Sequence, residues 1–123
     1  MGGLKLSGNA MQKIEVLDTA RRKIDRVNSL IEQYAIAKKL EEGFISQISR
    51  AALDASKVFM SAGYGTMADT CNQMIMLGKR GGTKPTKLRA YREMVTAVKT
   101  AIDYNVKMII EGEKKDHAAA TEV

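Results

Sequence analysis

An all-α fold, an irregular four-helix bundle with mostly antiparallel neighbours, is predicted by three features of the sequence. The 123 residues contain one proline, no tryptophan and 45% hydrophobic residues, a composition that favours helices over the aromatic and β-branched runs of strands. Apolar residues recur at steps of three and four, which is the spacing of one helix face. Glycine-containing breaks divide the pattern into four stretches, and short connections favour antiparallel packing in a single domain.

The first two stretches are expected to form helices. The chain is expected to reverse direction after the second helix, at residues 63–65. The first runs from Met11 to about Leu40, and the second follows Gly43. The sequence Gly-Tyr-Gly at residues 63–65 lowers the cost of a tight turn. The side chains expected to be buried are Ile14, Leu17, Ile24, Val27, Ile31 and Tyr34, then Phe44, Ile45, Ile48, Leu53, Val58 and Phe59.

The third and fourth stretches flank residues 78–85, which contain three glycines and one proline and are expected to form a loop. Thr66 with Asp69 resembles a capping arrangement, so a short third helix is expected to start there. Pro85 suits the first position of the fourth helix, where its missing amide costs nothing. The side chains expected to be buried are Met67, Met74, Ile75 and Leu77, then Leu88, Tyr91, Val95, Val98, Ile102 and Ile109.

Positive charge is concentrated in residues 79–92. This segment holds six basic and no acidic residues; the other 14 basic residues match the 14 acidic ones, so it accounts for the net charge of +6. A loop that leads into a helix start combines backbone amides, the positive helix end and basic side chains around phosphates. We therefore predict contacts to a nucleic-acid backbone, over a broad surface and without base reading. The candidate nucleic-acid-binding residues are Lys79, Arg80, Lys84, Lys87, Arg89 and Arg92, with Arg22 and Arg26.

Arg22 and Arg26 lie one turn apart on the face of the first helix opposite its apolar stripe. Asp18 and Asp25 are expected to neutralise part of their charge. The basic segment has two other interpretations: it binds an acidic protein partner, or it is a solvated helix start that binds nothing. Tyr91 is a candidate for stacking on a base, but its position in the apolar stripe favours the core.

The residues that catalysis or metal binding requires are not grouped in this sequence. His117 is the one histidine, and Cys71 is the one cysteine, with no histidine near it to act as a base. No Cys-x-x-Cys or His-Glu-x-x-His motif is present, and residues 83–85 break the P-loop pattern. We expect a protein that is not an enzyme and has no cofactor, no metal site and no small-molecule substrate.

Domain organisation and location follow from the ends of the chain and from the single cysteine. We expect a flexible leader over residues 1–10, a helical bundle domain over residues 11–111 and a flexible C-terminal tail over residues 112–123. A lone cysteine favours a reducing compartment, and no apolar run reaches the roughly 18 residues that a membrane span requires. The chain is therefore expected to be cytoplasmic and not associated with a membrane.

The run Thr-Lys-Pro-Thr-Lys-Leu-Arg-Ala-Tyr-Arg at residues 83–92, together with the small size, basic charge and helical composition, resembles the small subunit of CRISPR Cascade-like effector complexes. The resemblance implies that several copies stack along a guide-loaded backbone, in a role in antiviral defence. It also implies that Lys84, Arg89 and Arg92 hold a target or displaced strand and that the protein positions strands without cutting them. The partners would be single-stranded or displaced DNA or RNA and other protein subunits.

A helical adaptor is the alternative function. Such a bundle offers an apolar groove to an acidic or helical protein partner, and the basic segment then orients the acidic surface. The eight methionines are compatible with an adaptable binding surface, although methionine at helical spacing more often fills a core.

Overall fold

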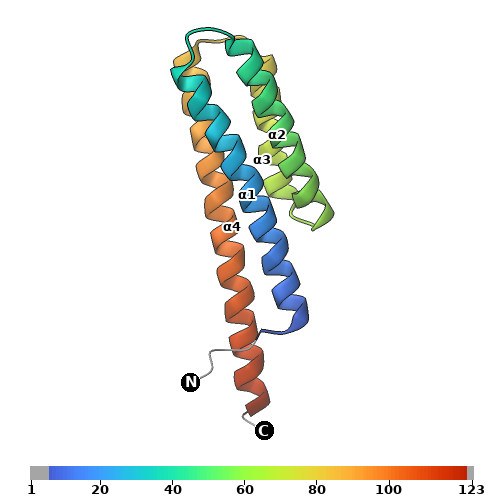
Figure 1. Ribbon diagram of the computed structural model, residues 1–123. Coiled ribbons are helices and arrows are strands. Elements are labelled where there is room, and N and C mark those ends of the chain that lie inside the picture. Colours follow the sequence, from blue (N-terminus) through green and yellow to red (C-terminus); the bar gives the residue numbers. More distant parts are fainter. Residues whose placement is uncertain (1–5, 122–123) are drawn as a thin grey trace.

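The computed structural model describes residues 6–121, with side chains for residues 6–114, and within this range it consists of helices and connections without strands. The helices are α1 (Gly8–Ile36), α2 (Glu41–Ser61), α3 (Gly65–Lys79) and α4 (Lys84–Thr121). Each helix packs against its neighbours in the chain, and α4 also packs against α1, which closes the ring (Figure 1). The all-α, irregular four-helix bundle with antiparallel neighbours is confirmed.

The core lies along the centre of this ring and follows the predicted stripes. Tyr34 of α1 and Tyr91 of α4 pack edge to face, with ring centroids 6.4 Å apart and planes at 89°. Tyr91 is fully buried, which makes it a core residue and excludes stacking on a base from this position. Leu53 is 43% exposed, so its predicted burial is wrong. The fully buried side chains include Leu17, Ile24, Ile31, Ile48, Phe59, Met74, Val98 and Ile102.

The helices α2 and α3 both carry small buried residues and pack against each other. Ala52 and Ala55 of α2 are fully buried, as is Ala68 of α3. Gly78 lies inside α3, so the expectation that it belongs to a loop is wrong. A Cβ at this position would meet Ile45 Cγ2 of α2 at 2.9 Å. Glycine at this position therefore serves close packing of α3 against α2 and does not end the helix.

The helices α1 and α4 are joined by a ladder of ion pairs. Glu32 pairs with Arg92, Asp25 with Lys99 and Arg21 with Asp103, in antiparallel order. The acids lie on α1 at one end of this ladder and on α4 at the other, so a shifted or parallel pairing would bring like charges together. The ladder is therefore a sequence-encoded register for these two helices.

The helices α1 and α4 extend beyond α2 and α3 (Figure 1). Ser7 caps α1 by accepting a hydrogen bond from the Ala10 amide at 3.1 Å, so α1 begins three residues before the expected start. The helix α4 continues through Gly112 to Thr121, so the expected helix end at Gly112 is wrong. Alanine, glutamate and lysine in this stretch are strong helix formers that offset the cost of one glycine. The outermost parts of the predicted leader and tail, residues 1–5 and 122–123, lie outside the described residues.

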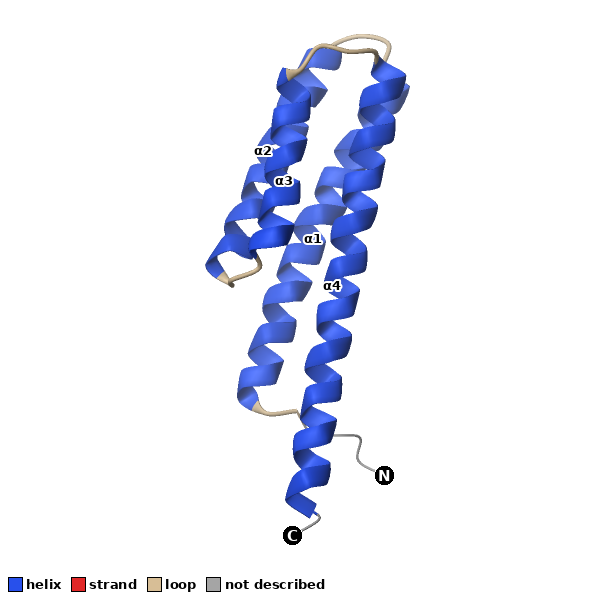
Figure 2. Ribbon diagram, turned by 180° about the vertical axis from the view of Figure 1, so that it is seen from behind, coloured by secondary structure: helices blue, strands red, loops and turns tan. Residues whose placement is uncertain are grey.

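The two ends of the bundle differ. At one end lie two connections, residues 37–40 between α1 and α2 and residues 80–83 between α3 and α4 (Figure 2). We call this the loop end. At the opposite end, which we call the terminal end, only the start of α1 and the later part of α4 remain side by side (Figures 1 and 2).

Candidate nucleic-acid interface

The loop end brings the predicted basic segment together with the connection between α1 and α2. Lys84, at the start of α4, donates a hydrogen bond from Nζ to the Ala37 carbonyl oxygen at 2.7 Å and another to Glu41 Oε1 at 3.2 Å. Its Nζ also lies 5.0 Å from the centre of the Tyr34 ring, within cation–π range. Lys84 therefore ties the two connections of the loop end to each other.

Lys84 is thus engaged inside the protein. Its side chain is 23% exposed and is paired with Glu41, so its charge is largely compensated. The expectation that Lys84 contacts nucleic acid directly is not supported by this arrangement. The residue instead positions the surface around it.

Arg92 is also paired internally. Its Nε and Nη2 donate to the two carboxylate oxygens of Glu32, at 3.0 and 2.8 Å. This hydrogen-bonded pair lowers the pKa of Glu32 and raises that of Arg92. Such bidentate pairs hold the guanidinium in a fixed geometry. Arg92 therefore contributes less free positive charge than the sequence alone predicted.

Lys87 lies on the buried stripe of α4, one turn before Tyr91. The residue is only 8% exposed, so its apolar stem belongs to the core. The prediction that Lys87 lies on an open binding surface is wrong.

Lys79, Arg80 and Arg89 are exposed, as predicted. None of them forms an ion pair within the part of the chain that the structure describes. Lys79 ends α3, and Arg80 begins the connection to α4. These three side chains are the available part of the predicted cluster.

Lys38 and Lys39 also belong to this cluster, although they were not among the predicted binding residues. Both are exposed in the connection between α1 and α2, which the Lys84 hydrogen bond fastens to the start of α4. Glu32 and Glu41 are already paired, which leaves Glu42 and Glu93 as the acids of the neighbouring segments. The exposed cations that we call the cationic surface are Lys38, Lys39, Lys79, Arg80 and Arg89.

A shallow hollow of about 660 Å³ lies beside the cationic surface, between the end of α1 and the start of α4. Ala35, Pro85 and Leu88 supply apolar groups to it. Lys84, Arg89 and Arg92 supply positive groups, and Glu93 supplies one negative group. Because Lys84 and Arg92 are paired with Glu41 and Glu32, Arg89 is the cation of this lining that has no ion pair among the described residues.

Arg22 and Arg26 lie away from the loop end. Both are exposed on the outer face of α1, and Arg22 donates to Thr19 Oγ1 at 3.2 Å. At 1.5 Å per residue, Arg26 lies roughly 15 Å along the helix from Ile36. Asp18 pairs with Arg21 and Asp25 with Lys99, so the expected neutralisation of Arg22 and Arg26 by these acids is wrong.

The one cysteine of the chain, Cys71, is buried. Burial raises the pKa of the Cys71 thiol to about 12, which keeps it protonated and unreactive. Burial likewise raises the pKa of the Tyr91 hydroxyl to about 12. No group of three or more metal-ligating side chains occurs in residues 6–114, and His117 lies outside the described side chains. No described helix is both long and apolar enough to cross a bilayer.

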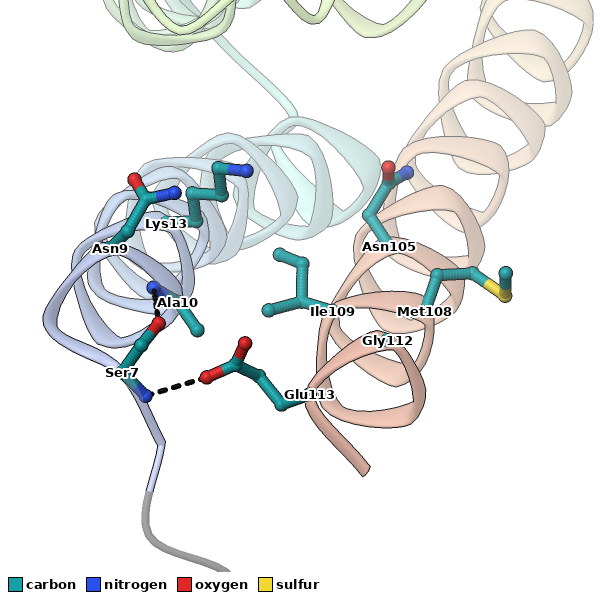
Figure 3. A pocket seen from close by; sticks show the side chains of 9 residues that line it. All are labelled: Ser7, Asn9, Ala10, Lys13, Asn105, Met108, Ile109, Gly112 and Glu113. Carbon is teal, nitrogen blue, oxygen red and sulfur yellow. Dashed lines mark hydrogen bonds between the residues drawn. The ribbon is translucent and has the colours of Figure 1, made fainter. Parts of the chain in front are cut away.

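The terminal end carries an open hollow of about 370 Å³ between α1 and α4 (Figure 3). Ile109 points into the space between the helices, and Ala10 lies opposite it (Figure 3). The Ser7 amide donates to Glu113 Oε1 at 2.6 Å and closes one side of this hollow. This hydrogen bond lowers the pKa of Glu113.

Comparisons of the chain with protein-family models, with curated proteins and with solved structures found no match.

Proposed function

We propose that this protein is a non-catalytic nucleic-acid-binding subunit of a larger cytoplasmic assembly and that it holds a single-stranded or displaced strand at its loop end. The observation that carries this proposal is the cationic surface, whose exposed lysines and arginines come from the two connections of the loop end and from the adjoining parts of α3 and α4. Its members have no ion-pair partner in the described part of the chain. A polyanion supplies a negative partner to each of these side chains at the same time.

The affinity of such a surface comes from the phosphates. Each phosphate neutralised on a single strand releases counterions and contributes about 0.7 to the slope of log affinity against log salt. Five cations therefore give a slope of roughly 3 to 4. This electrostatic mechanism does not depend on base sequence.

The membership of an assembly rests on the resemblance of residues 83–92 to the small subunits of CRISPR effector complexes. In such a complex the protein supports a strand that other subunits recognise. Lys84 and Arg92, which the resemblance assigns to the strand, then act mainly by positioning, because both are paired inside the bundle.

The test is a salt titration with a fluorescent single-stranded oligonucleotide. We expect Lys79→Glu/Arg80→Glu/Arg89→Glu to lower affinity at least tenfold and to reduce the salt slope by about 2. The matched control is Lys13→Glu/Lys57→Glu/Lys107→Glu, which makes the same charge change at exposed positions away from the loop end. Equal losses in the two variants, or no loss in the first, would refute the proposed site.

A protein-interaction adaptor is the second candidate, and the hollow at the terminal end favours it. Met108, at its edge, is 48% exposed, and Met11 and Tyr104 of the same end are 57% and 54% exposed. Copurification at native expression separates the two functions. Protein partners that persist after nuclease treatment and that Met108→Glu/Ile109→Glu removes would favour the adaptor.

A further inference from the structure

Two large apolar side chains are exposed where α1 ends and the connection to α2 follows. Ile36 is 80% exposed and Leu40 is 83% exposed. Leu40 also has φ 60° and ψ 33°, and it is the one non-glycine residue with positive φ among residues 6–121. A β-carbon makes this left-handed conformation unfavourable, so both the backbone and the side chain of Leu40 carry a cost.

The backbone at Leu40 has a structural purpose, but the side chain does not contribute to it. The Leu40 carbonyl oxygen accepts hydrogen bonds from the Gly43 and Phe44 amides, at 3.0 and 3.3 Å, and so starts α2. Glycine would adopt the same conformation without strain. The leucine side chain contacts little of the bundle, since most of its surface is exposed. Packing therefore does not explain why leucine is present here.

The surroundings of Leu40 are cationic. Lys38 and Lys39 directly precede it, and both are exposed. The hydrogen bond from Lys84 to Ala37 holds the connection next to the start of α4, at the same end of the bundle as the connection between α3 and α4 (Figure 2). Ile36 and Leu40 thus flank two exposed lysines in the chain, at the end of the bundle that carries the cationic surface.

We propose that Ile36 and Leu40 contact the bases of an unpaired nucleic-acid strand whose phosphates are bound by Lys38 and Lys39. This proposal rests on the proposed function and extends it, because it assigns a second segment to the site and a preference for unpaired bases. Apolar side chains insert between or against bases where these are unstacked, as leucine, isoleucine and methionine do in proteins that distort duplexes. In an intact duplex the base faces are covered by stacking, so Ile36 and Leu40 contribute less binding free energy there.

A lipid surface is the competing ligand, since it also offers anionic groups and an apolar layer. The nucleic acid is favoured because the cations extend beyond this connection to Lys79, Arg80 and Arg89, which come from a different connection and helix. A strand has phosphates at regular intervals along such a path. Two apolar tips alone offer a membrane only a small insertion area.

The experiment compares Leu40→Gly/Ile36→Ser and Lys38→Ala/Lys39→Ala with the wild-type chain. The probes are a single-stranded oligonucleotide, the same strand with abasic sites throughout its centre, and the matching duplex. For Leu40→Gly/Ile36→Ser we expect about a fivefold to tenfold loss of affinity for the normal single strand, little change for the abasic strand and an unchanged salt slope. For Lys38→Ala/Lys39→Ala we expect the salt slope to fall by about 1.4 on the two single strands and by about 1.8 on the duplex.

Thermal unfolding of Leu40→Gly alone separates binding from a structural role. Because glycine relieves the strain at this position, we expect the melting temperature to stay the same or to rise. A clear fall in melting temperature would mean that the leucine side chain stabilises the fold, and it would overturn the proposal.

The remaining outcomes distinguish this inference from the proposed function. If Lys79→Glu/Arg80→Glu/Arg89→Glu loses binding but neither variant of the α1–α2 connection does, the inference is wrong and the proposed function stands. If wild-type protein binds none of the oligonucleotides, both are wrong. If Leu40→Gly/Ile36→Ser loses binding only to vesicles of phosphatidylcholine and phosphatidylserine, the apolar tips serve a lipid surface and the inference is overturned.

Discussion

The two antiparallel pairs of this bundle, α2 with α3 and α1 with α4, are held together in different ways. Between α2 and α3 the contacts are small and close, with buried alanines and Gly78 against Ile45. One hydrogen bond, from Ser56 Oγ to Asn72 Oδ1 at 3.2 Å, adds a polar contact there. Between α1 and α4 a ladder of partly exposed ion pairs flanks the core.

This difference explains where free charge remains. Acids and bases on α1 and α4 cancel along the ladder, and Arg92 is drawn into it by Glu32. The cationic surface begins where the ladder ends, in the two connections of the loop end. Close packing should therefore dominate stability, while the ion pairs set register and leave the surplus charge at one end.

Gly78→Ala gives the largest expected effect on stability. The new Cβ would lie 2.9 Å from Ile45 Cγ2, 3.1 Å from Ser49 Oγ and 3.2 Å from the Tyr91 hydroxyl oxygen, so either α3 or these side chains must shift. We expect a loss of about 1 to 3 kcal/mol in the free energy of unfolding, measured in urea. Gly112→Ala is the control: nothing lies within 4 Å of its Cβ position, so it should be neutral or stabilising.

Lys84→Met should have the next largest effect. Methionine keeps most of the apolar stem but leaves the Ala37 carbonyl and Glu41 without their partner. We expect a loss of about 1 to 2 kcal/mol in urea unfolding. Faster hydrogen exchange of the Gly43 and Phe44 amides should accompany it, because the connection before α2 loses its anchor. An unchanged exchange rate would show that Lys84 does not position this connection.

The helical stripes could be predicted from the sequence because their signal is local. Residues such as Leu17, Ile24 and Val98 repeat at helical spacing, and burial of one face is enough to select them. Glycine was less informative, because the same residue ends a helix, allows close packing or is tolerated on a surface. Gly63, with φ 86°, ends a helix, whereas Gly78 packs against a neighbour and Gly112 remains helical.

The availability of each cation could not be predicted from local sequence. The acid that pairs with Arg92 is 60 residues away, and the acid that pairs with Lys84 is 43 residues away. A signal for Lys38 and Lys39 was nevertheless present. An antiparallel ring places the first and third connections at the same end, so basic residues near the expected end of the first helix belong beside residues 79–92.

Tyr91→Phe should raise stability, by up to about 1 kcal/mol in urea unfolding, because the Tyr91 hydroxyl is the buried side-chain polar atom without a hydrogen-bond partner in residues 6–114. In the wild type, burial disfavours the ionised hydroxyl and raises its pKa to about 12, so below pH 10 ionisation of Tyr91 does not affect stability. As the pH rises from about 10 towards 12, the unfolded chain loses this proton more readily than the folded protein, and the free energy of unfolding falls.

The pH dependence of the free energy of unfolding tests whether the Tyr91 hydroxyl is buried. Tyr91→Phe should lose less stability than the wild type over this alkaline range, although Cys71 still titrates in both proteins. Identical alkaline profiles would mean that the Tyr91 hydroxyl is not excluded from water. Tyr91→Phe should also soften the effect of Gly78→Ala, since it removes one of the crowded atoms.

The smallest expected effect belongs to the ladder between α1 and α4. Glu32→Gln should cost only about 0.5 kcal/mol in urea unfolding at neutral pH, because both partners of the pair are half exposed. Since Arg92 lowers the pKa of Glu32, the wild-type pair stabilises the fold above the ordinary carboxyl pKa of 4.5, and this contribution is lost as the pH falls through the lowered value. The difference in the free energy of unfolding between Glu32→Gln and the wild type should therefore become smaller in acid.

The exchange variant Glu32→Arg/Arg92→Glu separates register from simple charge. Either substitution alone places like charges opposite each other, whereas the double variant restores an ion pair with reversed direction. We expect the double variant to recover most of the stability that each single variant loses, in a double-mutant cycle by urea unfolding. If the double variant stays as unstable as the single variants, it matters which helix carries the acid of this ion pair. The pairs of the ladder then do more than match opposite charges.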